Sequence, residues 1–254
     1  MKRFLRLLQK DLQASLLPVG FLSGITLILL AFTRFKISTS AWPVEVSIAA
    51  VAIPLIFLPL WLLWQSFQTL RSEWREDTVY TLLVVPVPGW KVMFAKLLAI
   101  AIEYTVLLAV IVVGTLAFFL PLVREVMQFV PSFAWVLRNG ILLYLVSLAM
   151  LASVVIFVQL AFVVGKMVGR VQGLVALWTL VLSGWLVDRL GVLLEPLFRW
   201  LPTLPLHKLF RLEELRQGVV AEWNLAPEIG TWLGILGVLA LTSYLFEHYV
   251  EVNG

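Results

Sequence analysis

The sequence predicts an all-α membrane protein with six transmembrane helices, and its composition and long apolar runs are the reasons. Of its 254 residues, 61% are hydrophobic and 13% are charged, and the mean hydropathy is +1.00. Soluble domains carry about 25% charged residues, so this chain has too little charge to cover a water-exposed surface. A helix needs roughly 20 apolar residues to cross a bilayer. We expect spans at about 16–33, 46–70, 97–123, 140–164, 171–187 and 229–246, in a single transmembrane domain over 1–254.

The first residues, 2–15, predict an amphipathic helix that lies in the membrane interface. Phe4, Leu8 and Leu12 recur at helical spacing, and the basic residues lie between them. Such a helix buries its apolar face among the lipids and turns its cations towards the headgroups. The alternative is a frayed basic tail. In the span that follows, Gly20 and Gly24 would allow another helix to approach closely.

The second span carries features that suit either a cavity or a membrane interface. Pro54 and Pro59 lie in its body, so a kink is expected because proline removes a backbone donor. Trp61, Trp64 and Gln65 follow the kink. These three side chains could line a path for cargo, or they could form an interfacial aromatic belt.

Glu103 lies within the third span. A carboxylate inside the membrane is a functional candidate because burying its charge is costly. The alternative is that the hydrocarbon begins near Tyr104 and that Glu103 is interfacial. With Trp61, Trp64 and Gln65, Glu103 completes the candidate cargo path.

The connection between the fifth and sixth spans predicts two further amphipathic helices. Between 190 and 201, leucine and phenylalanine recur at i, i+3, i+4 and i+7, opposite charged residues. Pro202 and Pro205 should end this helix, and a second amphipathic segment follows over 206–216. Neither segment is apolar enough to span, so both should lie on the outer interface or re-enter the membrane there.

The basic residues favour placing both termini in the cytosol. With that orientation, the first five polar segments hold ten Lys and Arg inside and four outside, although 188–227 adds five outside. Basic residues near the first span usually dominate orientation. The net charge of +4 therefore indicates membrane topology, and we expect no nucleic-acid partner.

The sequence offers no constellation for catalysis or metal binding. It has no cysteine, and its two histidines, His207 and His248, are far apart. Neither a zinc-protease motif nor a nucleophile elbow is present. We therefore expect no catalytic residue, metal site or cofactor site in this chain. Since it also has no nucleotide-binding motif, energy for transport would have to come from a partner that touches the cytosolic connection 71–96.

That connection carries a resemblance to a known family. After the second span come Glu73 and Glu76, a Thr/Leu segment over 78–83, the turn Pro86-Val87, and a basic restart at Lys91 and Lys96. This order resembles the first cytoplasmic loop of ABC type-2 exporter permeases. The chain departs from the family pattern at Asp77, where glycine is frequent, and at Val79, where leucine is frequent.

The resemblance implies a permease half in the bacterial cytoplasmic (inner) membrane that pairs with a second copy and with a separate ABC-type ATPase. ATP and Mg would bind in that ATPase. A short coupling helix would contact it through Asp77, Thr78, Val79, Tyr80, Thr81, Leu82 and Leu83. The cargo would be amphipathic or hydrophobic, such as a peptide, lipid or drug, and it would leave the cell. The alternatives are a non-transporting immunity, sensor or scaffold subunit, and a proton-coupled secondary transporter that uses Glu103.

Overall fold

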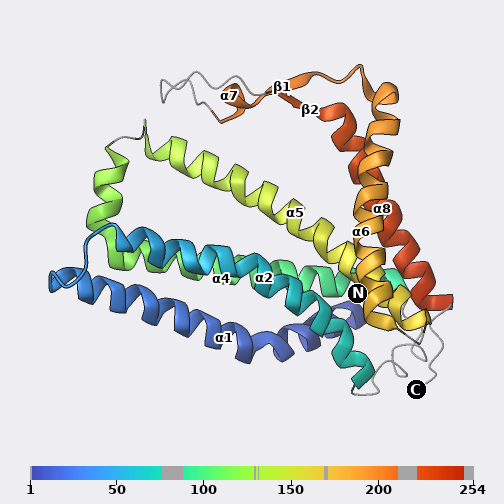
Figure 1. The fold of residues 1–254 in the computed structure, drawn as a ribbon, viewed down its shortest axis with the longest axis horizontal. Coiled ribbons are helices and arrows are strands. Elements are labelled where there is room, and N and C mark those ends of the chain that lie inside the picture. Colours follow the sequence, from blue (N-terminus) through green and yellow to red (C-terminus); the bar gives the residue numbers. More distant parts are fainter. Residues whose placement is uncertain are drawn as a thin grey trace. The chain divides into compact units, whose positions relative to one another are not determined.

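The computed structural model describes residues 2–75, 88–128, 130, 132–168, 171–210 and 222–248, shown as a ribbon in Figure 1. Within these residues, six helices are long and apolar enough to cross a membrane. They are α1 (Lys2–Ser38), α2 (Val46–Arg75), α4 (Gly89–Met127), α5 (Phe133–Val168), α6 (Gln172–Leu194) and α8 (Leu225–His248). The expected fold class, an all-α membrane protein with six spans, is therefore confirmed.

Several helices extend beyond the expected spans. The segment 2–15 is the first part of α1, which continues without a break to Ser38 and includes Pro18. At 1.5 Å per residue α1 is about 55 Å long, well beyond the roughly 30 Å of a hydrocarbon core. Helix α4 bends at Phe119, whose φ and ψ are −119° and 26°. Pro121 explains this bend because its ring clashes with the preceding turn.

The region between α6 and α8 differs from the expected pair of amphipathic helices. The first part of the segment 190–201 continues α6, and a 3-10 helix, η1 (Glu195–Phe198), follows. Pro196 accounts for this change because it cannot donate the next α-helical hydrogen bond. Two short antiparallel strands, β1 (Thr203–Pro205) and β2 (Glu222–Asn224), then pair with Leu204 opposite Trp223. Of the second expected helix, 206–216, the structure describes residues 206–210, and the helical part of these is α7 (Leu206–Leu209).

The chain forms two compact units, and α2 and α4 each contribute to both. Unit 1 comprises residues 1–69 and 94–129, and unit 2 comprises 70–93 and 130–254. The core of unit 1 contains large apolar side chains from α1, α2 and α4: Leu30, Leu58, Leu62, Leu107, Ile111 and Phe119. Gly114 lets α4 approach α1, because a Cβ there would lie 2.8 Å from the Leu30 side chain.

In unit 2, α6 packs against both α5 and α8. Helices α6 and α8 approach each other closely at two glycines. A Cβ on Gly230 would lie 2.9 Å from the Cα of Gly191, and a Cβ on Gly191 would meet the Thr231 side chain. Lipid supplies no hydrophobic drive for helix pairing, so close backbone contact of this kind carries much of the association.

Candidate functional site

Unit 1 contains a row of polar side chains, which we call the polar seam, and all of them are buried except the half-buried Gln65. The members of the polar seam come from three helices: Asp11 and Ser15 of α1, Gln65, Ser66 and Thr69 of α2, and Lys96 and Glu103 of α4. On α1, Asp11 and Ser15 continue the stripe of Phe4 and Leu8, because the spacing of four, three and four residues keeps them on one helix face. Phe4 stacks on Phe94 of α4 at a centroid distance of 6.1 Å.

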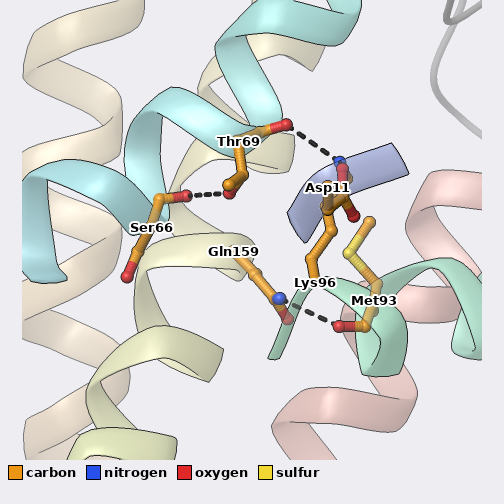
Figure 2. Close-up of polar contacts among 6 residues, drawn as sticks. All are labelled: Asp11, Ser66, Thr69, Met93, Lys96 and Gln159. Carbon is orange, nitrogen blue, oxygen red and sulfur yellow. Dashed lines mark hydrogen bonds and ion pairs between the residues drawn. The ribbon is translucent and has the colours of Figure 1, made fainter. Parts of the chain in front are cut away.

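Lys96 is the centre of the polar seam and has only 2% of its surface exposed. Its Nζ donates a hydrogen bond to the Thr69 carbonyl at 2.9 Å and lies 3.3 Å from Asp11 Oδ1. Figure 2 shows Lys96 between these two groups. A charge this far from water must be paired. Asp11 therefore supplies the counter-charge that allows Lys96 to be buried.

Glu103 lies two helical turns from Lys96, roughly 10 Å along α4, and is 2% exposed. Ser15 and Gln65 place polar groups beside its carboxyl group. The Ser15 hydroxyl donates to the Leu12 carbonyl at 3.0 Å. By hydrogen-bond geometry, neither carboxyl oxygen of Glu103 has a partner among the described residues. Glu103 is thus a buried acid whose oxygens remain unsatisfied by the protein groups described.

A small cavity of about 30 Å³ lies in unit 1 between α1, α2 and α4. Its lining is mostly apolar and includes Leu22, Thr26, Pro54, Phe57, Leu58, Trp61, Leu107 and Ile111. The buried Trp61 Nε1 has no hydrogen-bond partner among the described residues. A cavity of this size can hold a water molecule, but it cannot hold a peptide or a lipid.

Of the four cargo-path candidates, the structure brings Gln65 and Glu103 together, and it places Trp61 at the small cavity. Trp61 and Gln65 are one turn apart on α2, and both face the interior of unit 1, where Gln65 lies beside Glu103. Trp64 is 52% exposed and points outwards. The four residues therefore do not line one continuous surface in this conformation.

The connection between α2 and α4 is called the central connection from here on. In unit 2, both of its ends rest on α5 and α8, in an arrangement that we call the loop base. Trp74, near the end of α2, packs edge-on against Phe162 of α5 at a centroid distance of 5.0 Å and against Phe246 of α8 at 6.2 Å. Lys166 Nζ lies 5.9 Å from the centroid of the Trp74 ring. The neighbouring Glu73 is 3% exposed. The outgoing end of α2 is therefore packed and not free.

The incoming end of α4 is held in the same way. The backbone N–H of Gly89 donates to the Glu247 carboxylate of α8. Only glycine fits at this position, because a Cβ would lie 2.7 Å from the Ser243 carbonyl. Four residues later, the Met93 carbonyl accepts a hydrogen bond of 3.1 Å from Gln159 Nε2 of α5 (Figure 2). Gly89, Met93 and Trp74, with their partners on α5 and α8, complete the loop base.

The expected ATPase-contact residues, 77–83, lie outside the described residues, which stop at Arg75 and resume at Pro88. Their expected helical structure therefore stays a prediction. Among the residues that the structure describes, no group of three or more acidic or histidine side chains is placed to hold a metal ion.

Sequence reasoning missed the Asp11–Lys96 pair and the loop base. Asp11 carried a usable signal, because a lone acid continues the inward stripe of Phe4 and Leu8. Lys96 looked like an ordinary basic residue at the start of a span. Its partners are 27 and 85 residues away in the sequence, so only the packing of three helices reveals the contact.

The polar seam and the loop base both involve helices that a family comparison covers. Residues 9–184 match the model of the ABC-2 family transporter proteins, and these residues include all of α2, α4 and α5. Neither a curated protein nor a solved structure matches the chain. Since the matched region is well over half of the 254 residues, the chain belongs to the ABC-2 family of transporter proteins and is an integral membrane permease component of an ABC transporter.

Proposed function

We propose that this chain is the permease of an ATP-driven exporter, and that a separate ATPase contacts residues 77–83 of its central connection. The loop base is the observation that carries this proposal. The described ends of the connection rest on two transmembrane helices, α5 and α8, through Trp74, Gly89 and Met93. A displacement imposed on the connection would therefore be passed to those helices through packed contacts. A connection that merely joined two spans would not need such anchors.

The ATPase would bind ATP and Mg and would supply the energy, because transport against a gradient requires an energy source. A second copy of this chain would complete the permease as a homodimer in the bacterial inner membrane, with both termini in the cytosol. Many large apolar side chains are exposed on the single chain, among them Trp64 at 52%. Some of these would face lipid, and others would face the second copy.

The cargo would be amphipathic or hydrophobic and would move out of the cell. The cavity in unit 1 is too small for such a cargo, so the path would lie between the two copies. Trp64 is the one of the four cargo-path candidates that points outwards from unit 1. It is therefore the side chain that cargo could touch without opening unit 1.

The test begins with co-purification of the full-length chain and identification of a bound ATPase by mass spectrometry. Replacing residues 77–85 with a Gly/Ser sequence should abolish both the stimulation of that ATPase and transport, with unchanged membrane abundance. Trp74→Ala should weaken stimulation while the ATPase still co-purifies, because Trp74 supports the connection from within unit 2. Trp178→Ala is the matched control, since Trp178 is 57% exposed on α6, and it should change neither property.

Three outcomes would contradict this assignment. Transport that survives the replacement of 77–85 would show that the ATPase does not act through this connection. Transport that follows a pH gradient without ATP would indicate a secondary transporter. An ATPase that binds and is stimulated while no cargo moves would indicate a sensor or scaffold subunit.

A further inference from the structure

The unsatisfied carboxyl group of Glu103 requires an explanation that the permease function does not supply. Glu103 is 2% exposed, and neither of its oxygens has a hydrogen-bond partner among the described residues. An ionised carboxylate in such a place loses its hydration and has only the neutral Ser15 and Gln65 side chains beside it, and this loss costs several kcal/mol even after the surroundings relax. A group in this position is stabilised only if a positive charge or a proton neutralises it.

The charged neighbours do not provide that neutralisation. Helix α1 contributes Asp11 to the polar seam, α4 contributes Lys96, and α2 contributes neutral side chains. Tyr104, next to Glu103 on α4, carries no cationic group. Lys96 is ion-paired with Asp11 at 3.3 Å, so these two charges cancel. With Glu103 ionised, the three groups would carry one net negative charge inside the membrane.

We propose that Glu103 is a proton-binding site within the membrane domain, and that the Asp11–Lys96 ion pair controls its occupancy. While the pair is closed, the Lys96 charge is matched by Asp11, and Glu103 keeps its proton as a neutral acid. When the pair opens, Lys96 leaves an unmatched positive charge on the same face of α4. Glu103 then releases its proton to water and becomes the counter-ion. The step moves one proton and no electrons, and it is independent of whether an ATPase drives the chain.

The arrangement of α4 supports this exchange of counter-ions. Lys96 and Glu103 are seven residues apart, so they lie on one helix face two turns from each other. Asp11 lies near both of them, as the ion-pair partner of Lys96 and as a charge that acts on Glu103. Lys96 thus has two acids that can balance its charge: Asp11 does so while the pair is closed, and Glu103 does so once Asp11 has moved away from Lys96.

The proposal can be tested on the purified full-length chain with dicyclohexylcarbodiimide, an apolar reagent that modifies protonated carboxyl groups. Labelling is measured by mass spectrometry of the tryptic peptide 97–124, at a series of pH values, in choline chloride. We expect an adduct on Glu103 that is lost in Glu103→Gln. The exposed Glu45 is the internal control: it should resist this reagent and react with a water-soluble carbodiimide.

Asp11→Asn tests the control by the ion pair. Removing the Asp11 charge should lower the labelling of Glu103 by about tenfold or more, because a nearby unmatched cation favours the ionised form. Asp11→Glu keeps the charge and should retain the labelling. Monodisperse elution of each variant on size exclusion shows that it is folded.

Three results would overturn the proposal. An unlabelled Glu103 at every pH, in folded protein whose Glu45 reacts with the water-soluble reagent, would show that Glu103 holds no proton. Labelling that sodium, potassium or ammonium chloride suppresses relative to choline chloride would identify a bound cation as the occupant. Equal labelling of wild type and Asp11→Asn would show that the ion pair does not control the site.

Discussion

At the scale of single residues, a lysine inside a membrane helix determines what its surroundings must provide. Lys96 is satisfied by the Asp11 carboxylate and the Thr69 carbonyl, at 3.3 and 2.9 Å. The Asp11 carboxylate balances the charge of Lys96, and the Thr69 carbonyl accepts one of its hydrogen bonds. The pair therefore fixes the register of α1, α2 and α4 within unit 1 more strictly than apolar packing alone would.

Breaking this pair should destabilise the protein strongly. Lys96→Met leaves Asp11 buried without its counter-charge, and the removal of one partner from a buried pair costs about 3–5 kcal/mol. The double variant Asp11→Asn/Lys96→Met should recover most of that loss, because no uncompensated charge remains. The midpoint of unfolding in a detergent titration measures both effects. Lys91→Gln is the control, because Lys91 lies outside the polar seam with its Nζ 5.4 Å from the Trp90 ring centroid. A double variant as unstable as Lys96→Met would show that the charges are not coupled.

At the scale of elements, glycines let α6 and α8 approach each other closely. Gly191 of α6 faces Gly230, Thr231 and the Pro227 carbonyl of α8. Gly184, two turns earlier on α6, has no atom within 4 Å of an added Cβ. Two glycines of one helix thus have opposite surroundings.

This difference predicts opposite outcomes for the same substitution. Gly191→Ala should push α6 and α8 apart and lower the free energy of unfolding by about 1–3 kcal/mol, as overpacking does. Gly184→Ala should be neutral or slightly stabilising, because alanine favours the helix and meets no neighbour. Thermal unfolding of the two purified variants, followed by size exclusion, measures the effect. A similar loss in both would mean that glycine acts here through backbone flexibility.

The elements also show what could be predicted from the sequence. The apolar runs located all six long helices because membrane insertion depends on local composition. The ends of these helices were missed where a single residue decides the conformation. Pro196, the second residue of η1, is such a residue because it ends the α-helical pattern of α6. The β1–β2 pair was missed because Thr203 pairs with Asn224, and pairing across a long connection leaves no local pattern. Glu103 was recognised as a candidate, but its burial depends on three helices that meet only in the folded chain.

At the scale of the whole molecule, the orientation in the membrane decides whether a cytosolic ATPase can reach the central connection. The chain contains no cysteine, so each introduced cysteine is a unique reporter. Met167→Cys, at the end of α5, should react with a membrane-impermeant maleimide only after the membrane is opened. Ser40→Cys and Ser132→Cys, which follow α1 and precede α5, should react from outside intact spheroplasts. The reverse labelling pattern would place the central connection outside the cell and exclude an ATPase contact there.

The division of the chain into units sets the order in which its contacts can form during synthesis. Unit 2 takes residues 70–93 from the first half of the chain and 130–254 from the second. The ribosome delivers Trp74 and Gly89 well before their partners Phe162 on α5 and Phe246 and Glu247 on α8 exist. Unit 1 has all its helices once residue 129 has been made, whereas the loop base waits for nearly the last residue of α8. A chain that stops before α8 therefore cannot assemble the loop base, so the contacts that hold the connection form only after α8 has been made.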